Sequence, residues 1–254
     1  MGFTSDIKTV SGVDIGLYRG GEGTPALFLH GANGVAGWSP LFEKLAVHHD
    51  LLVPEHPWFG RSQCPEHIGS VADLALFYLD LLDELHLRDV HLIGTSLGGW
   101  IAAELAVRNT SRLSRVTLVA PAGVLPAGAP VRDLFSWSRE ELTRKLFANQ
   151  GIAEKLLSVE PSHAQADTDL KNRVATCRYA MGPRFANPGL KDWLHRIDVP
   201  LDIVWGKEDG IVPASAANIW KDAVPGARVS FIENCGHLPH AEKAEETARL
   251  LTAG

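Results

Sequence analysis

A serine at position 96 has glycines two residues before and two residues after it, in the run Gly94-Thr95-Ser96-Leu97-Gly98-Gly99. The apolar stretch Val90 to Ile93 precedes this run, and the apolar, helix-periodic stretch Leu97 to Val107 follows it. The pattern predicts a strand, a sharp turn and a helix. A serine on such a turn projects its hydroxyl out of the fold, and glycines are needed there because larger side chains would collide. Ser96 is therefore the candidate nucleophile; the alternative is a capping serine at a helix N-terminus.

A histidine near the end of the sequence is the candidate base for this serine. A serine hydroxyl is a poor nucleophile at neutral pH, so it needs a base whose pKa lies near the operating pH, and histidine is such a base. His237 stands in the sequence Cys-Gly-His, shortly after the predicted strand Ala227 to Ile232. His240 is the nearest alternative.

An aspartate after the preceding predicted strand is the candidate for the group that orients the histidine. Asp209 follows the strand Leu201 to Trp205, in a turn that also holds Glu208, its nearest alternative. Its carboxylate would fix the imidazole tautomer and stabilise the imidazolium that forms when the serine loses its proton. Because the carboxyl ends of parallel strands open on the same edge of a sheet, Ser96, Asp209 and His237 can converge although they are far apart in sequence.

The chain order of serine, acid and histidine resembles that of the α/β-hydrolase family, and two further motifs extend the resemblance over nearly the whole chain. The run His30-Gly31-Ala32-Asn33-Gly34, after the predicted strand Ala26 to Leu29, resembles the oxyanion loop of the family. Residues Pro54 to Ser62 are similar to the family's D-x-P-G-F-G-x-S turn, but Glu55 replaces aspartate and Trp58 replaces glycine. The second change places a large ring at the expected pocket rim.

The resemblance also implies which groups would receive the negative charge of the substrate oxygen. These are the backbone N–H groups of Ala32 and of Leu97, which opens a helix whose dipole adds to the effect. It further implies a substrate pocket, for which the candidates are His30, Gly31, Asn33, Trp58 and Arg173. Arg178 and Arg184 are alternatives to Arg173, and all three arginines could instead be solvated helix charges.

The elements that must position these residues alternate along the chain. A hairpin is expected first, followed by strands and helices in turn: Ile7–Val10, Val13–Tyr18, Ala26–Leu29, Trp38–Val47, Leu51–Val53, Val71–His86, Val90–Ile93, Leu97–Val107, Val116–Val119, Leu201–Trp205, Ala214–Ala223 and Ala227–Ile232. This alternation predicts an α/β fold with a mostly parallel sheet covered by helices on both faces.

One long stretch interrupts the alternation. Between Val124 and Val199 the sequence shows helical patterns without a convincing strand, around residues 138–148, 152–157, 168–181 and 190–197. We therefore expect a core of residues 1–122 and 200–254, with residues 123–199 inserted as a helical cap of the kind that the family places over its active site. The alternative is that these helices pack elsewhere on the sheet.

Composition narrows the class of protein. The chain has 254 residues, of which 45% are hydrophobic, enough for one large core. The formal charge of −6 argues against nucleic acid and anionic membranes as partners, and no stretch of about twenty apolar residues is present. Three scattered cysteines form no metal-binding pattern, and the chemistry requires no cofactor. The odd cysteine count and the start of the sequence indicate a cytoplasmic protein, whose oligomeric state stays open.

The resemblance limits the reaction to a few classes. A serine nucleophile disfavours dehalogenase and epoxide-hydrolase chemistry, for which similar proteins use aspartate. The leading interpretation is hydrolysis of a small, largely apolar carboxylic ester or related acyl substrate. The second is carbon–carbon bond hydrolysis of ring-cleavage products, because His30 to Trp38 resembles the oxyanion loop of those enzymes, although Leu238 stands where they tend to carry tryptophan. In that group an arginine of the cap binds the substrate carboxylate. A third is a small-molecule receptor that barely turns over.

Overall fold

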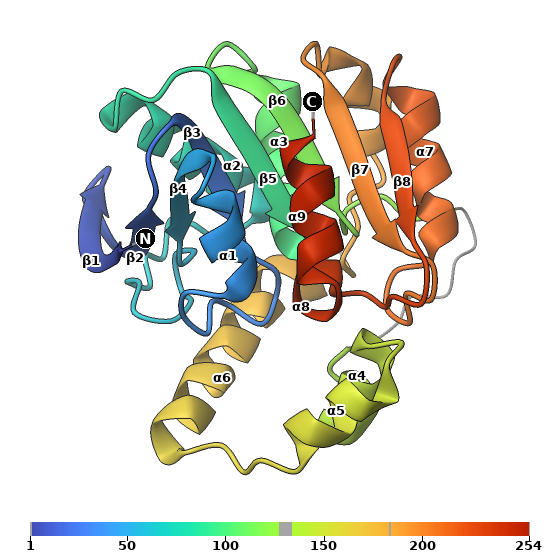
Figure 1. The fold of residues 1–254 in the computed structure, drawn as a ribbon. Helices are drawn as coiled ribbons and strands as arrows, with labels where there is room; N and C mark the ends of the chain where they lie inside the picture. Colours follow the sequence, from blue (N-terminus) through green and yellow to red (C-terminus); the bar gives the residue numbers. More distant parts are fainter. Residues whose placement is uncertain (1, 127–133, 183, 254) are drawn as a thin grey trace.

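A computed structural model describes residues 2–126, 134–182 and 184–253 of the chain. Within these residues eight strands form one sheet in the order β1-β2-β4-β3-β5-β6-β7-β8 (Figure 1). Their bounds are β1 Phe3–Val10, β2 Val13–Gly20, β3 Thr24–Leu29, β4 His49–Pro54, β5 Val90–Thr95, β6 Leu113–Val119, β7 Leu201–Gly206 and β8 Arg228–Ile232. β2 pairs antiparallel with β1 and β4, and the other pairs are parallel. The predicted mostly parallel α/β fold is confirmed.

Helices cover both faces of this sheet (Figure 1). Side chains of α1 (Pro40–Leu45) and α9 (Ala244–Thr252) join one buried apolar cluster. Side chains of α2 (Val71–Glu84), α3 (Leu97–Arg108) and α7 (Ala217–Ala223) join the other. Burial of apolar side chains on each face therefore holds the sheet between two helical layers.

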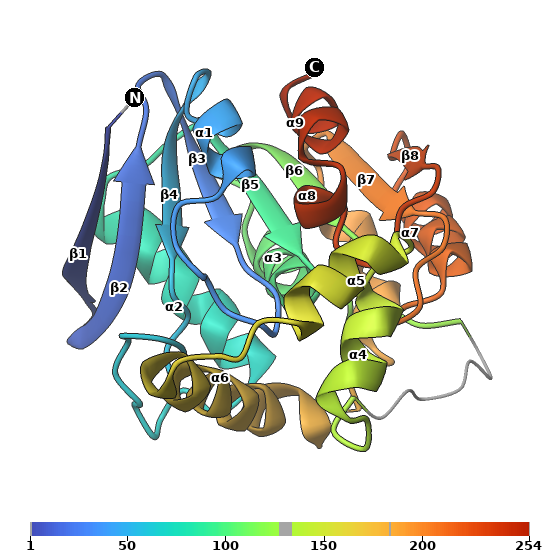
Figure 2. The ribbon, with the colours of Figure 1, turned by 60° about the horizontal axis from the view of Figure 1, so that its bottom comes forward.

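The insertion is helical, as its sequence predicts. It contains α4 (Arg139–Leu146), α5 (Gln150–Leu157) and α6 (His163–Thr176), then a π-helical turn and a 3₁₀ helix, Leu190–Arg196. Figures 1 and 2 show α6 on one side and α4 with α5 on the other, both beyond the carboxyl ends of the parallel strands. Residues 127–133 and 183 of the expected cap lie outside the described residues, and the division into core and cap stays a prediction.

Several element boundaries differ from the sequence prediction for local reasons. The helix expected from Trp38 begins at Pro40, because Ser39 caps it. The helix expected from residue 168 begins at His163, where the Ser162 hydroxyl accepts the N–H of Gln165. β1 begins at Phe3 rather than Ile7, on an edge strand whose side chains are almost all exposed, so no apolar alternation marks its start. The closing helix α9 was not expected at all.

Candidate active site

Ser96 lies at the turn between β5 and α3, with φ 52° and ψ −114°. A non-glycine residue at positive φ is strained, by roughly 1–3 kcal/mol. The turn brings backbones into direct contact: a Cβ on Gly94 would lie 2.3 Å from the Gly98 carbonyl oxygen, and one on Gly98 would lie 2.0 Å from that of Leu29. Ser96 occupies the N-cap position of α3, yet its side chain makes no capping hydrogen bond. The hydroxyl is thus available for another partner.

That partner is His237, on the loop after β8. Its Nε2 lies 2.9 Å from the Ser96 Oγ, and its Nδ1 lies 2.8 Å from the Asp209 Oδ2. The His237 side chain is buried, and the three residues form one continuous hydrogen-bonded chain. Such an arrangement can pass the serine proton to the imidazole while the carboxylate stabilises the resulting positive charge.

The Asp209 carboxylate is held by donors on both oxygens. Oδ1 accepts the backbone N–H groups of Ile211 and Val212, at 2.8 and 2.9 Å. Oδ2 accepts the indole N–H of Trp205 at 2.9 Å in addition to its contact with His237. These bonds fix the carboxylate in the orientation that meets the imidazole.

The two alternatives from the sequence have other partners. Glu208 accepts the backbone N–H of Cys235 at 2.9 Å. The Nδ1 of His240 lies 3.5 Å from the Thr95 hydroxyl, and burial together with the nearby His237 lowers the pKa of His240 to about 4. The structure therefore brings Asp209 and His237, rather than Glu208 or His240, to the serine.

The loop after β3 lies directly against the serine. A Cβ on Gly31 would lie 3.3 Å from the Ser96 Cβ. Within the described part of the chain, the backbone N–H groups of Ala32 and Leu97 donate to no protein group. Two unpaired donors beside a candidate nucleophile can receive an oxygen on which negative charge develops.

The buried His30 side chain fixes the direction of the Ala32 N–H. Its Nδ1 lies 2.7 Å from the Gly31 carbonyl oxygen, and its Nε2 accepts the backbone N–H of His56 at 3.0 Å. The Gly31 carbonyl and the Ala32 N–H share one planar trans peptide, so holding the first aims the second the opposite way. Burial lowers the pKa of His30 to about 4, which keeps the ring neutral. The sequence suggested a pocket residue; the ring is 2% exposed and braces the loop.

His56 and Tyr78 complete this support, and the sequence analysis missed both. The His56 ring stacks on His30 with 3.7 Å between centroids, and its Nε2 donates to the His30 carbonyl oxygen at 2.9 Å. The Nδ1 of His56 lies 2.5 Å from the Tyr78 hydroxyl. Burial lowers the pKa of His56 well below its ordinary value and raises that of Tyr78, so both groups are neutral. In the sequence, His56 stands at a variable position of the turn motif. Tyr78 looks like one more residue of the apolar face of α2. Neither position therefore indicated a role at the site.

The remaining pocket candidates lie on the loops and on the insertion. Asn33 is exposed. Trp58 has φ 75°; its indole N–H donates to the Pro65 carbonyl at 2.9 Å, and the Arg178 guanidinium lies 4.4 Å from its ring centroid. Arg173 is exposed and donates to the Phe135 carbonyl at 2.9 Å.

The alternative arginines differ from each other. Arg178 donates to the carbonyls of Ile68 and Glu66, at 3.1 and 2.6 Å, and so joins the insertion to the loop after β4. Arg184 is exposed. Within the described part of the chain, Arg173 contacts Phe135 and Arg178 contacts Glu66, Ile68 and Trp58, and neither side chain bonds to Ser96, His237 or Asp209.

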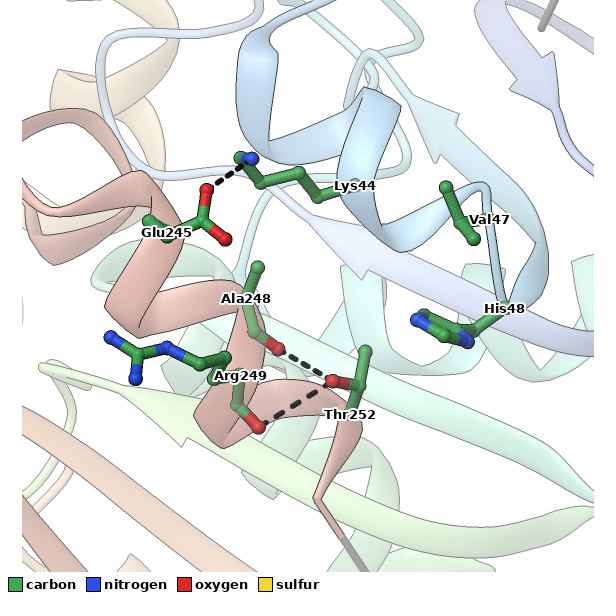
Figure 3. A pocket seen from close by; sticks show the side chains of 7 residues that line it. All are labelled: Lys44, Val47, His48, Glu245, Ala248, Arg249 and Thr252. Carbon is green, nitrogen blue, oxygen red and sulfur yellow. Dashed lines mark hydrogen bonds and ion pairs between the residues drawn. The ribbon is translucent and has the colours of Figure 1, made fainter.

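Elsewhere, a hollow lies between α1 and α9 (Figure 3). Its side chains include the Lys44–Glu245 ion pair and Thr252, whose hydroxyl bonds carbonyls of its own helix. None of the candidate site residues lines it. Among the described residues no cluster of three or more His, Cys, Asp or Glu could hold a metal ion. In the same residues no helix has the length and apolar content needed to cross a membrane.

The chain matches known proteins in sequence and in fold. A family model described as "Alpha/beta hydrolase family" matches residues 26–250. The dihydrolipoyllysine-residue acetyltransferase component of the acetoin cleaving system of Cupriavidus necator is 30% identical over 244 residues. The match covers 92% of this chain but only 64% of the length of that relative. The 2-hydroxymuconate semialdehyde hydrolase of a Pseudomonas species is 26% identical over 270 residues, 95% of this chain and 90% of the relative. The solved meta-cleavage product hydrolase of Pseudomonas fluorescens, 19% identical, shares the fold at a TM-score of 0.81, covering 97% of this chain and 95% of its own.

Proposed function

The chain belongs to the α/β-hydrolase family, and from this premise we propose that it is a serine hydrolase of a small, largely apolar carboxylic ester or related acyl substrate. The observation that carries the proposal is the unbroken contact from the Ser96 Oγ through His237 to the Asp209 carboxylate. The unpaired N–H groups of Ala32 and Leu97 beside this serine support it.

The proposed reaction has two halves. His237 takes the proton of Ser96 while its Oγ bonds to the substrate carbonyl carbon, and the oxygen of the tetrahedral intermediate accepts hydrogen bonds from Ala32 and Leu97. The bond to the leaving alcohol then breaks as His237 returns the proton to it. Water attacks the acyl-enzyme in the same way, and the bond between Ser96 and the acyl carbon breaks to release the acid and the free serine.

A second candidate is hydrolysis of a carbon–carbon bond in a ring-cleavage product. Its support is the 2-hydroxymuconate semialdehyde hydrolase that resembles nearly the whole chain. The binding of a substrate carboxylate by Arg173 belongs to this candidate, and in the structure that side chain is bonded to the Phe135 carbonyl. Loss of activity toward a carboxylated dienoate in Arg173→Ala, with ester hydrolysis retained, would favour it.

The test is a panel of p-nitrophenyl esters, lactones and ring-cleavage dienoates, assayed with the wild type, Ser96→Ala and Ser111→Ala. Ser111 is exposed and is the matched control. We expect ester hydrolysis to fall at least about 10⁴-fold in Ser96→Ala and to be unchanged in the control. Retention of more than about a tenth of the rate in Ser96→Ala would show that another group is the nucleophile. A burst without steady release in the wild type would indicate a receptor instead of an enzyme.

A further inference from the structure

We infer that Asn172 and Thr176, on the inserted helix α6, are positioning residues that hold the Ala32 loop in the shape needed to receive the substrate oxygen. The inference rests on the proposed function. It assigns to the insertion a part in the reaction itself, beyond that of covering the site.

Asn172 joins two core loops through a single buried amide. Its Nδ2 donates to the Asn33 carbonyl oxygen at 3.0 Å, and its Oδ1 accepts the backbone N–H of Gly60 at 2.9 Å. The residue is 4% exposed. The two loops follow β3 and β4, so one side chain fixes the separation between the candidate oxyanion loop and its neighbour.

The loop is shaped to admit this amide. Gly34 has φ 76°, a region that glycine adopts without strain. A Cβ on Gly34 would lie 2.4 Å from the Nδ2 of Asn172, so any larger residue would displace the amide or the loop. Gly34 also donates its own N–H to the Gly31 carbonyl at 3.1 Å. The conformation of the loop at Gly34 therefore leaves the space that the Asn172 amide occupies.

Thr176 holds the same loop one residue earlier. Its hydroxyl lies 3.2 Å from the Ala32 carbonyl and 2.8 Å from the Asn172 carbonyl, so its single proton is shared between them. His30 already holds the Gly31 carbonyl. The peptide planes before and after Ala32 are therefore both held by side chains, one from the core and one from the insertion, and the direction of the Ala32 N–H is fixed.

The attachment of α6 to these loops is mainly polar, although Ala175 also joins the buried apolar cluster. Lys171 adds hydrogen bonds from its Nζ to the carbonyls of Gly60 and Ser62, at 2.6 and 2.8 Å. By contrast, Leu170 and Val174 are 63% and 48% exposed. Hydrogen bonds depend on distance and angle, whereas apolar contact is non-directional. A helix fastened in this way can set the geometry of a loop as well as cover it.

The inference predicts a loss in kcat and little change in KM. A displaced N–H weakens an interaction made mainly in the transition state, and such changes lower kcat and kcat/KM together. Displacing a reacting group by about 1 Å can cost up to about a hundredfold in rate.

The experiment compares two threonine substitutions on one helix. Thr176 and Thr168 both bond the carbonyl four residues earlier, at 2.8 and 2.9 Å, but only Thr176 also reaches the core loop. We expect Thr176→Val to lower the kcat for a p-nitrophenyl ester about fivefold and Asn172→Asp about tenfold or more, with KM changed less than about twofold. Thr168→Val should match the wild type, and Thr176→Ser should restore most of the rate.

A second readout separates positioning from stability. A trifluoromethyl ketone adds to the serine as a tetrahedral oxyanion, so its inhibition constant should rise in Thr176→Val by the same factor as kcat falls. A raised KM with unchanged kcat, an unchanged inhibition constant, or equal behaviour of Thr176→Val and Thr168→Val would overturn the inference. If Asn172→Asp does not fold, the threonine pair decides alone. Failure of the proposed function appears separately, as an inactive wild type or an active Ser96→Ala.

Discussion

The two flanks of the candidate site are held by different kinds of group. The base flank consists of the loops after β7 and β8, which carry Asp209 and His237, and carboxylates fasten it. Glu208 accepts the N–H of Cys235 at 2.9 Å. Glu242 accepts the N–H of Gly236 at 2.7 Å, and it also accepts backbone N–H groups from the insertion. The backbone N–H of His237 itself donates to the Leu146 carbonyl of α4 at 2.9 Å.

The oxyanion flank consists of the loops after β3 and β4, which carry Ala32 and His56. Neutral side chains hold the Ala32 loop and its neighbour, namely those of His30, His56, Tyr78, Asn172 and Thr176. The cations Lys171 and Arg178 add hydrogen bonds to carbonyls of the loop after β4. Glu55, a buried carboxylate on the loop after β4, is paired with Arg61 at 2.8 Å.

The difference follows from the charge that each flank must stabilise during the proposed reaction. In the proposed reaction the Asp209 carboxylate stabilises the imidazolium that forms when the serine loses its proton, and Glu208 and Glu242 hold the loop that carries the ring. An unpaired carboxylate beside Ala32 would repel the negative oxygen of the intermediate, most strongly in a buried and poorly screened site. Neutral and cationic side chains shape that flank, and neither kind opposes the negative charge.

The largest effect is expected from a substitution in the base flank. Asp209→Asn keeps the shape of the side chain but removes the charge and favours the wrong imidazole tautomer, so we expect kcat to fall about 10⁴-fold. Glu208→Gln is the matched control, because a glutamine oxygen can still accept the Cys235 N–H. Ester hydrolysis by the two variants measures the difference. Comparable losses in both would mean that charge on the flank, rather than contact with His237, is what matters.

The sequence predicted that Ser96, Asp209 and His237 would converge, because their signals are local. Ser96 is marked by its glycines, and Asp209 and His237 each follow a strand that the alternation of elements predicts. The mostly parallel sheet followed from the same alternation. The exposed start of β1 left no comparable pattern. The apolar residues Ala244, Ala248 and Leu251 do recur at helical spacing in α9, and the sequence analysis passed over them because they follow the last candidate site residue.

The supports of the oxyanion flank could not be predicted in this way. Asn172 bonds residues 112 and 139 positions away in the sequence. In a helix most of whose residues are polar, a buried asparagine looks in the sequence like any other polar residue. His56 and Tyr78 likewise acquire their roles only when a loop and a helix pack together. Such roles depend on tertiary contacts that a single sequence does not display.

The second-largest expected effect is a loss of folding stability at low pH. Burial lowers the pKa of His30 from its ordinary 6.5 to about 4, that of His91 to about 3, and that of His56 well below its ordinary value. From pH 6.5 downward the unfolded chain binds protons that the folded chain excludes, so the free energy of unfolding should fall as the pH falls toward about 4. Each histidine contributes about 1.4 kcal/mol per pH unit over this range.

Urea unfolding at a series of pH values measures the slope of the free energy of unfolding against pH. His91 lies away from both flanks and bonds Thr117, so His91→Gln should reduce the slope by about one proton without lowering activity at neutral pH. The exposed His67→Gln is the matched control. In His30, a proton on Nε2 would face the His56 N–H that it now accepts, so acid should disturb the oxyanion flank directly. A free energy of unfolding that does not change between about pH 6.5 and 4 would contradict the neutral state assigned to His30 and His56.

The smallest expected effect concerns Trp58, at the outer edge of the oxyanion flank. Its φ of 75° strains a non-glycine residue by about 1–2 kcal/mol, and glycine would relieve this. The substitution would also remove the hydrogen bond to Pro65 and the stacking of Arg178, each worth about 1 kcal/mol or less, and would make the unfolded chain more flexible. These terms nearly cancel, so we expect Trp58→Gly to lower the free energy of unfolding by about 1 kcal/mol or less in urea. The resemblance to the family implies that the ring lies at the pocket rim, so longer acyl chains should be hydrolysed faster relative to short ones in Trp58→Gly. An unchanged profile of rate against acyl-chain length would remove the ring from the pocket and leave it as a support of the loop through Pro65 and Arg178.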